Sequence, residues 1–557
     1  MTSTQHVPPS RARTRRGKAF DSVVHRLLKL PRATSDYMVA RGVRVPMRDG
    51  VDLLADHYQP TTPALGTLVV RGPYGRSGLY ATNFARIYAQ HGYHVVFVSC
   101  RGTFGSGGTF HPQIHEVDDG ADTVAWLREQ PWFGGRFATV GLSYLGFTQW
   151  ALLMDPPPEL VAAVVLVGPH DFKRVVYGSG AFTLNDFLGW SDMVANQEKY
   201  GPVRSLLRMQ SGDRRLAPVL RGLPLREAGE LHLAGGASWY GDWVSRRNLD
   251  DPFWNGNDLT AALDRVSVPV HLISGWQDIF LDQTLDQYAH LGGRHQDVAL
   301  TVGPWTHLDV VTKGAGVVAR ETLDWLAEHL AGTSTRTRPS PVRVYVTGAD
   351  EWRHVPDWPP AAGSPQTLYL QPAERLGPEV PAADAGTVDF TYDPTDPTPT
   401  IGGRLLSPAS GGRRNDSKLA ERADVLCFTG PVLSEPLEVL GVPVVELAHT
   451  SDNPHADLSV RISEVDAKGR SRNVSDGFVR LDPAGPADVV RLSLDAIAHR
   501  FSAGSRIRLI IAGGSHPRFD RNLGTGDDPA TSSGTAPSHR TITLAGGASR
   551  VVLPVTG

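Results

Sequence analysis

The chain has 557 residues, of which 41% are hydrophobic and 20% are charged, so it has the composition of a globular protein with two or three domains. The formal net charge of −3 argues against a general nucleic-acid-binding protein, which would carry a large positive charge. No run of about 18 apolar residues occurs, so the sequence contains no transmembrane helix. We therefore expect a cytoplasmic protein that binds neither nucleic acid nor membrane.

Residues 1–36 form a basic, proline-containing segment. The stretch TRRGKAF within it resembles a twin-arginine export signal. The apolar segment that such a signal needs does not follow, because DSVVHRLLKLP has basic residues inside a short amphipathic pattern. We expect a disordered tail followed by a small docking helix.

Residues 37–170 alternate between strand and helix patterns. They open with an alternating segment around the tight turn RDG, which predicts a hairpin. Four further runs are short and almost continuously apolar: GTLVVRG, YHVVFVSC, RFATVGLS and LVAAVVLVG. Such runs are typical of parallel strands covered on both faces, and capped helices such as DDGADTVAWLREQ are predicted between them. The same rhythm resumes in residues 260–335, so we expect an α/β fold with one parallel sheet.

The remaining parts of the chain have different patterns. Residues 171–259 are helical and rich in tryptophan, and we expect them to form a cap inserted over the carboxyl edge of the sheet. The stretch TSTRTRPSP has the composition of a linker. Nearly every segment of residues 336–557 is a short strand bounded by glycine, proline or aspartate, which predicts an all-β sandwich of the jelly-roll type.

A single serine, Ser143, lies where the strand RFATVGLS meets the helix YLGFTQWALLM. Such a sharp turn exposes the hydroxyl and surrounds it with backbone N–H groups of a helix N-terminus, as a nucleophile requires. Glycine at 141 relieves crowding between strand and helix. The usual pattern is G-x-S-x-G, but here leucine stands at 145 and the second glycine follows at 146, so the motif alone is compatible with a chance match.

A nucleophilic serine needs a general base and a carboxylate that orients the base. Asp278 follows one predicted buried strand and His307 follows the next, in the chain order Ser, Asp, His that α/β-hydrolases use. Each residue alone has an ordinary explanation, as a turn aspartate or a structural histidine. Three matches in order at three strand ends favour a catalytic triad. His170 precedes Asp278 and does not fit this order.

Other candidate sites are weaker. His111 and His115 resemble metal ligands, but no third ligand is suitably spaced. The stretch RGTFGSGG resembles a phosphate-binding loop, yet it lacks the lysine of a P-loop and is predicted to be a turn. Cys100 and Cys427 lie in apolar runs and are predicted to be buried thiols. We therefore expect neither a metal nor another cofactor.

Taken together, these residues resemble the cocaine esterase family, which includes X-Pro dipeptidyl peptidases, α-amino-acid ester hydrolases and cephalosporin acylases. The resemblance extends from about residue 37 to the end of the chain. The matching motifs are RGPYGR, RGTFGSGG, GLSYLG, YGSGAFTLNDFLGW, GWQDIF, GPWTH and HPRFDRNLGTG. In this family the nucleophile motif is G-x-S-Y-x-G, which accounts for the displaced glycine. The resemblance implies an α/β-hydrolase core, a helical cap and a C-terminal jelly-roll domain.

The resemblance also implies roles for individual residues. It makes Ser143 the nucleophile, Asp278 the orienting acid and His307 the general base. The hydroxyl of Tyr74 and the backbone N–H of Tyr144 match the two donors of the oxyanion hole.

The substrate is suggested by one difference within the family. α-Amino-acid ester hydrolases hold the substrate ammonium with acidic residues, two of them just after the catalytic aspartate, whereas Phe280 and Leu281 stand there in this chain. A buried ammonium without carboxylates would be costly, so selectivity for α-amino acyl groups is not expected. Phe280 matches an aromatic residue of the acyl pocket in cocaine esterase. Trp190 and Tyr177 are candidates for further pocket wall or for plain packing.

The favoured function is a serine hydrolase that cleaves small-molecule carboxylic esters through an acyl-enzyme. Two alternatives within enzymes are X-Pro dipeptidyl-peptidase activity and amide or β-lactam acylase activity. A third, from another class, is a degenerate hydrolase whose jelly roll serves as a binding module. The intact set of Ser143, Asp278, His307 and Tyr74 argues against degeneration. Homo-oligomer formation stays open.

Overall fold

The computed structural model describes residues 8–201, 204, 207–208, 210–335, 338–361, 363–485 and 489–555. The first seven residues of the predicted tail, some positions of the predicted cap between 202 and 209, and linker positions 336 and 337 lie outside this part. The chain divides into two units. They are Met1–Phe172, Pro252–Gly275 and Gln283–Val342 for the first, and Lys173–Asp251, Trp276–Asp282 and Arg343–Gly557 for the second. Each unit is described by itself.

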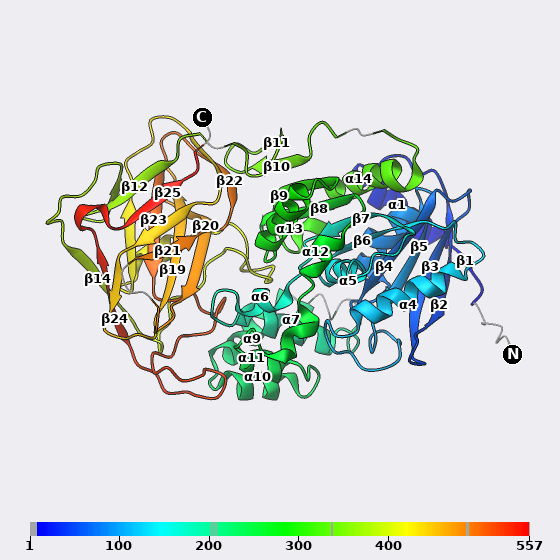
Figure 1. Ribbon diagram of the computed structural model, residues 1–557, viewed down its shortest axis with the longest axis horizontal. Coiled ribbons are helices and arrows are strands. Elements are labelled where there is room, and N and C mark those ends of the chain that lie inside the picture. Colours follow the sequence, from blue (N-terminus) through cyan, green and yellow to red (C-terminus); the bar gives the residue numbers. More distant parts are fainter. Residues whose placement is uncertain are drawn as a thin grey trace. The chain divides into compact units, whose positions relative to one another are not determined.

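The first unit is built on a sheet whose strands follow the spatial order β1-β2-β3-β5-β4-β6-β7-β8-β9 (Figure 1). These strands are β1 Arg11–Ala12, β2 Tyr37–Pro46, β3 Asp52–Pro60, β4 Gly66–Gly72, β5 Tyr93–Ser99, β6 Phe137–Leu142, β7 Leu160–Leu166, β8 Val270–Gln277 and β9 Val298–Thr306. The strands from β5 through β4, β6 and β7 to β8 pair in parallel, whereas β1, β2, β3 and β5 pair antiparallel. Burial along β5 and β6 explains their continuous apolar runs, as parallel strands covered on both faces require.

Helices of the first unit connect and cover these strands. They are α1 Arg15–Leu28, α2 Gly78–Ala81, α3 Ile87–Ala89, α4 Glu116–Arg128, α5 Tyr144–Leu152, α12 Ala261–Arg265, α13 Leu281–Gly293 and α14 Ala315–Leu326, with the short helical turns η1 Thr82–Arg86, η2 Pro252–Asn257, η3 Asp309–Val311 and η4 Ala327–Ala331. The predicted hairpin is confirmed, because β2 and β3 pair around a turn closed by the Met47 N–H on the Val51 carbonyl at 2.8 Å. The predicted strand–helix junction at Ser143 is confirmed as β6 followed by α5.

The N-terminal segment differs from the expected disordered tail. Strand β1 pairs with β2, and α1 begins at Arg15, six residues before the amphipathic stretch that predicted it. Thr14 is the N-cap of α1, because its hydroxyl accepts a hydrogen bond from the Gly17 N–H at 3.1 Å, and a partly buried ion-pair group fixes the segment before it. The Arg13 guanidinium lies 2.6 Å from Asp21 and 2.6 Å from Asp36, and it also stacks on the Tyr37 ring at 4.6 Å. The expectation of disorder is therefore wrong for residues 11–14.

The second unit joins the cap helices to the strands of the C-terminal half. The described cap helices are α6 Phe172–Tyr177, α7 Leu184–Asn196, α9 Gly212–Arg221, α10 Leu225–Leu233 and α11 Tyr240–Ser245. Within this unit the cap contacts the C-terminal half directly. Backbone hydrogen bonds join Asn185 to Pro517 at 3.0 Å and Leu225 to Pro529 at 2.9 Å, and the Phe182 N–H donates to Asp520 Oδ1 at 2.9 Å.

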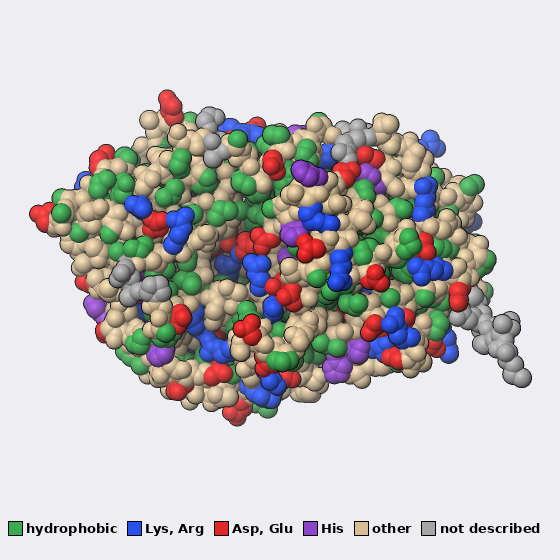
Figure 2. All heavy atoms as spheres, viewed as in Figure 1, with side chains coloured by type: hydrophobic (Ala, Val, Ile, Leu, Met, Phe, Trp, Pro, Cys, Tyr) green, Lys and Arg blue, Asp and Glu red, His purple; other side chains and the backbone are tan. Residues whose placement is uncertain are grey.

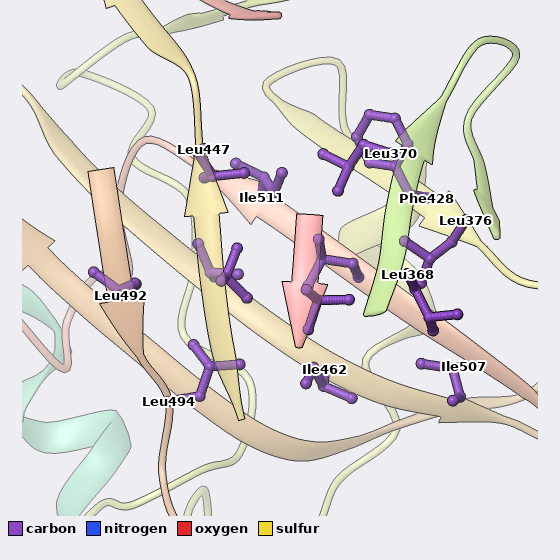
Figure 3. Close-up of a cluster of buried hydrophobic side chains, with 14 of the residues drawn as sticks. Leu368, Leu370, Leu376, Phe428, Leu447, Ile462, Leu492, Leu494, Ile507 and Ile511 are labelled. Carbon is purple, nitrogen blue, oxygen red and sulfur yellow. The ribbon is translucent and has the colours of Figure 1, made fainter. Parts of the chain in front are cut away.

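The C-terminal half is all-β, as predicted. Its strands are β10 Val342–Val346, β11 Glu351–Val355, β12 Gln366–Gln371, β13 Arg375–Gly377, β14 Thr387–Tyr392, β15 Val425–Thr429, β16 Leu437–Gly441, β17 Val444–Leu447, β18 His449–Ser451, β19 Asp457–Val465, β20 Ser471–Arg480, β21 Val490–Ser493, β22 Ile497–Phe501, β23 Arg506–Ala512, β24 Ser538–Thr543 and β25 Arg550–Leu553. Among the described residues, the main sheet has the order β20-β19-β23-β15-β13-β12-β25-β17-β21. Figure 3 shows its buried face, where Leu368, Leu370, Ile462 and Ile511 point into one apolar cluster.

Candidate active site

Ser143 occupies a strained turn between β6 and α5. Its backbone has φ 57° and ψ −123°, a conformation that non-glycine residues rarely adopt and that costs on the order of 1–3 kcal/mol. The turn is held on both sides. The Ser143 N–H donates to the Leu166 carbonyl at 2.9 Å, and the Ser143 carbonyl accepts from the N–H groups of Gly146 and Phe147 at 2.7 and 3.0 Å. Strain that the surroundings hold in this way is typical of a nucleophile elbow.

The displaced glycine of the elbow has a packing explanation. A Cβ atom at Gly146 would lie 2.5 Å from the Gly168 Cα, so this glycine lets α5 approach the end of β7. The residue before it, Leu145, fills space that two other glycines leave open. A Cβ atom at Gly141 would lie 2.5 Å from the Leu145 Cβ, and one at Gly72 would lie 2.3 Å from a Leu145 methyl group. In the motif G-L-S-Y-L-G the large side chain stands at position 145 and the close approach of the two backbones occurs at position 146. In G-x-S-x-G, by contrast, glycine stands at the position that Leu145 occupies here.

The Tyr144 side chain belongs to a buried polar network beneath the elbow. Its hydroxyl donates to Glu116 Oε1 at 2.8 Å and accepts from the Gln113 N–H at 2.8 Å. Glu116 is also paired with Arg71 at 2.8 Å and contacted by the Cys100 thiol at 3.6 Å. Burial raises the pKa of Tyr144 well above its usual value, so the phenol stays protonated and can donate its hydrogen bond to Glu116. This network fixes the residue whose backbone N–H was predicted to be an oxyanion donor.

Tyr74 lies in the loop after β4, as predicted, and is half-buried. Its ring stacks on Tyr80 with centroids 5.2 Å apart and meets the Tyr144 ring edge-on at 6.5 Å and 77°. The structure thus brings the ring of Tyr74 against the ring of Tyr144, the residue that follows Ser143 in the chain. Edge-to-face contacts of this kind restrict the orientation of both rings.

His307 follows directly on β9 and is 2% exposed. Trp305, two residues earlier, packs tightly against two glycines. A Cβ atom added at Gly303 would lie 2.4 Å from the indole ring, and one added at Gly314 would lie 2.6 Å from it. The Trp305 carbonyl leaves no room for a side chain at Gly275 of β8 either, since a Cβ atom there would lie 2.2 Å from the oxygen. The sequence GPWTH is therefore a rigid strand end that sets the position of His307.

Asp278 follows directly on β8 and is fully buried. Its Oδ2 accepts a hydrogen bond from the Phe280 N–H at 3.1 Å, and its backbone carbonyl accepts one from Leu281 at 3.3 Å. Strands β8 and β9 are neighbours in the sheet, and β7 separates β8 from β6. The chain positions of Ser143, Asp278 and His307 are thus the carboxyl ends of β6, β8 and β9.

The two predicted pocket residues of the cap are part of the cap's own aromatic core. Trp190 lies 5.8 Å from Trp239 and 5.6 Å from Trp243, measured between ring centroids. The Tyr177 hydroxyl donates to the Val244 carbonyl at 2.8 Å. These contacts favour the packing explanation for both residues. Phe280 is 6% exposed and stays a candidate for the pocket wall.

The residues that the sequence analysis set aside as weaker site candidates make contacts that stabilise the fold. The N–H groups of His170 and Asp171 donate to Gln283 Oε1 at 2.8 and 2.9 Å. The glycine-rich stretch after β5 is a turn, as predicted, and its Arg101 pairs with Asp119 at 2.6 Å. Cys100 and Cys427 are buried, as predicted.

Two features are absent from the described part of the chain. No group of three or more His, Cys, Asp or Glu side chains in this part of the chain could hold a metal ion. None of its helices combines the length and the apolarity needed to span a membrane.

Sequence reasoning missed Glu116 and Arg71. Glu116 lies between the histidine-containing loop and the predicted helix DDGADTVAWLREQ and was given no role, although it is buried and paired with Arg71. An arginine inside an apolar strand, as in LVVRG, was the signal that a buried counter-charge is needed, because an unpaired buried charge is costly.

Two family profiles match the chain. The profile described as X-Pro dipeptidyl-peptidase (S15 family) matches residues 49–309, and that of the X-Pro dipeptidyl-peptidase C-terminal non-catalytic domain matches residues 335–552. Cocaine esterase of Rhodococcus sp. (strain MB1 Bresler) is 30% identical over 543 residues, which cover 88% of this chain and 93% of that protein.

Solved structures share the fold. An aminopeptidase from the marine sediment archaeon Thaumarchaeota archaeon has a TM-score of 0.80 at 22% identity, covering 95% of this chain and 98% of that chain. An α-amino-acid ester hydrolase has a TM-score of 0.80 at 21% identity, covering 94% and 97%. At these identities the two structures support the fold alone.

Proposed function

Because the chain belongs to the cocaine esterase and X-Pro dipeptidyl-peptidase family of serine hydrolases, we propose that it cleaves carboxylic esters with an apolar or aromatic acyl part. The observation that carries the proposal is the strained backbone of Ser143, with φ 57° and ψ −123°, at a strand–helix junction. Nothing in the packing of a structural serine requires such a conformation, whereas a nucleophile at the sheet edge does.

In the proposed mechanism, the Ser143 Oγ attacks the ester carbonyl carbon while His307 takes the hydroxyl proton. Asp278 orients the imidazole and stabilises the imidazolium. The carbonyl oxygen becomes an oxyanion that accepts hydrogen bonds from the Tyr74 hydroxyl and the Tyr144 backbone N–H. Collapse of the intermediate breaks the C–O bond, and His307 gives its proton to the leaving alcohol. Water, activated by the same histidine, then attacks the acyl-enzyme and releases the carboxylic acid and Ser143.

The surroundings of Phe280 support a neutral acyl group. Phe280 and Leu281 stand where an ammonium-binding subsite would have acidic residues. The next acidic side chain, Asp282, is held by Arg404 at 2.8 Å, so its charge is already compensated. Arg404 also contacts Asp495 at 2.8 Å, and burial raises the pKa of Asp495 to about 7, so this carboxyl group carries a full negative charge much less readily than an exposed aspartate. A free amino group of a substrate would find little unpaired negative charge in this segment.

A substrate panel tests the proposal. Aryl esters of acetic, butyric and benzoic acid are compared with X-Pro anilides, with Ser143→Ala as the control for non-enzymatic hydrolysis. We expect turnover of the esters, a rapid burst of one alcohol per active site on an activated aryl ester, and at least a hundredfold lower kcat/KM for the anilides.

The alternatives give different results in the same panel. Preferential cleavage of X-Pro anilides would show an exopeptidase and contradict the ester proposal. Absence of both burst and turnover would leave the chain as a degenerate hydrolase whose β-sandwich has a binding role.

A further inference from the structure

Helix α1 presents an unusual apolar stripe to solvent. Phe20, Val23 and Leu27 are 49%, 55% and 73% exposed, and their spacing of three and four residues places them on one face of the helix. The Arg86 guanidinium lies 4.9 Å from the Phe20 ring centroid and leaves about half of that side chain accessible. Scattered exposed apolar residues are normal on proteins, but an aligned stripe on one helix indicates an interaction surface.

A neighbouring face of α1 is firmly docked on the first unit. Asp21 is 2% exposed and pairs with Arg13 at 2.6 Å and Arg86 at 2.7 Å. The Leu28 carbonyl accepts a hydrogen bond from Arg320 of α14 at 2.6 Å, and Figure 1 shows α1 beside α14. The apolar stripe therefore faces outward because the buried face of the helix is fixed elsewhere.

Basic residues are concentrated in the segment that contains the stripe. Residues 8–35 contain eight of the 55 Lys and Arg residues of the chain but only one of its 58 Asp and Glu residues, so the rest has 47 basic against 57 acidic residues. Six of the eight are exposed and form no ion pair within the described part of the chain: Arg11, Arg15, Arg16, Arg26, Lys29 and Arg32. Over the face shown in Figure 2, by contrast, acidic and basic side chains are interspersed.

We propose that α1 docks on an anionic phospholipid surface, with Phe20, Val23 and Leu27 inserted among the lipid headgroups. A helix that combines an apolar stripe with flanking arginines and lysines binds such surfaces by apolar burial and by attraction to acidic lipids. A second copy of the chain is a poorer occupant, because a stable dimer needs about 800 Å² per partner and three side chains fall well short of that. A nucleic acid would leave the apolar stripe without a role. The proposal revises the expectation of no membrane contact and does not depend on the esterase proposal.

Vesicle flotation of the full-length protein tests this inference. The vesicles contain phosphatidylcholine alone or with 30% phosphatidylglycerol, at about 50 and 500 mM salt, since surface attraction is screened by salt. We expect flotation with the acidic vesicles at low salt, and at least tenfold weaker partitioning with neutral vesicles or at high salt. The variants Val23→Ser with Leu27→Ser, and Arg15→Gln with Arg26→Gln and Lys29→Gln, should each lose at least tenfold.

Matched controls carry the same changes elsewhere on the surface. Leu231→Ser removes an 81% exposed leucine, and Arg136→Gln with Lys468→Gln and Arg472→Gln removes three exposed charges. Both controls should float like the unmodified chain, and all variants should keep its melting temperature and esterase rate. Flotation that is equal for neutral and acidic vesicles, or unchanged by the α1 variants, would overturn the proposal. The proposal would also be overturned if the protein did not float with any vesicles and light scattering showed a dimer that the double variant Val23→Ser with Leu27→Ser abolishes. The stripe would then bind a second copy of the chain.

Discussion

Replacing Gly146 by alanine tests whether close packing of α5 on the end of β7 holds the elbow. The new methyl group would lie 2.5 Å from the Gly168 Cα, 3.3 Å from a Val165 methyl group and 3.4 Å from the Gly168 nitrogen. Carbon atoms in good contact lie about 3.5–4 Å apart, so the strand end and the helix must separate by roughly 1 Å. Neither side can yield by rotating a side chain, because the closest contact joins two backbones.

The expected magnitude follows from two opposing effects. Overpacking in a tight core costs about 1–3 kcal/mol, and a contact between backbones falls at the upper end of that range. Alanine gains roughly 1 kcal/mol over glycine in a helix, which offsets part of the cost. We expect the free energy of unfolding to fall by about 2 kcal/mol. Because α5 carries Ser143 at its start, a shift of this size should also lower kcat/KM by about a hundredfold.

The assay is urea unfolding followed by tryptophan fluorescence, together with aryl-ester kinetics below the transition. Gly189→Ala in α7 is the matched control, since the only described atom that its methyl group would meet is a Leu216 methyl at 3.9 Å. That variant should be unchanged or up to about 1 kcal/mol more stable, with full activity. If Gly146→Ala were as stable and as active as Gly189→Ala, close packing would not be the reason for glycine at 146.

Three further predictions concern groups around the elbow and the sheet. Tyr144→Phe leaves the Glu116 carboxylate and the Gln113 N–H without their hydroxyl partner, so the free energy of unfolding should fall by about 2–4 kcal/mol. At low temperature, where the variant is still folded, kcat should stay within about threefold of the unmodified enzyme. A large loss of kcat would show that the hydroxyl takes a direct part in catalysis. Tyr74→Phe should lower kcat by about 10²–10³ with KM within a few-fold, and a kcat within threefold of the unmodified enzyme would leave the oxyanion to backbone donors. Burial lowers the pKa of His57 to about 3 and of His94 to about 4, whereas both titrate near 6.5 when the chain is unfolded. The unfolded chain therefore takes up protons first as the pH falls, and the stability present above pH 6.5 declines toward pH 4 by about 3 kcal/mol for each of the two histidines. Urea unfolding at several pH values checks this, and His94→Gln should flatten the decline; an unchanged slope would contradict it.

Several features of the fold could be predicted because local sequence and tertiary structure agree. The run YHVVFVS is apolar without alternation, and β5 is buried along its length, so composition alone predicted a covered parallel strand. The elbow was predictable because a strand, a serine and a helix follow one another without interruption. Asp278 and His307 could be chosen because each directly follows a recognisable strand.

Other features depend on partners far away in the chain. The order of the segment before α1 depends on the ion pair of Arg13 with Asp36, 23 residues away, although the start of α1 itself has a local signal that was overlooked, the N-cap residue Thr14. The network of Glu116 and Tyr144 joins residues 28 apart, so the sequence around Glu116 did not indicate a buried carboxylate. Likewise, the sequence predicted a cap over the sheet from its loss of strand pattern, but the hydrogen bonds that hold Asn185 and Leu225 to the C-terminal half come from residues more than 300 positions away.

The central claim is that Ser143 becomes covalently acylated during turnover. Intact-protein mass spectrometry after treatment with an organophosphate or a slow aryl ester measures this directly, with digestion to locate the modified peptide. We predict one adduct per chain on the peptide that contains Ser143, none in Ser143→Ala, and at least a 10⁴-fold lower rate for that variant. An adduct on a different serine, or an unmodified rate in Ser143→Ala, would contradict the account.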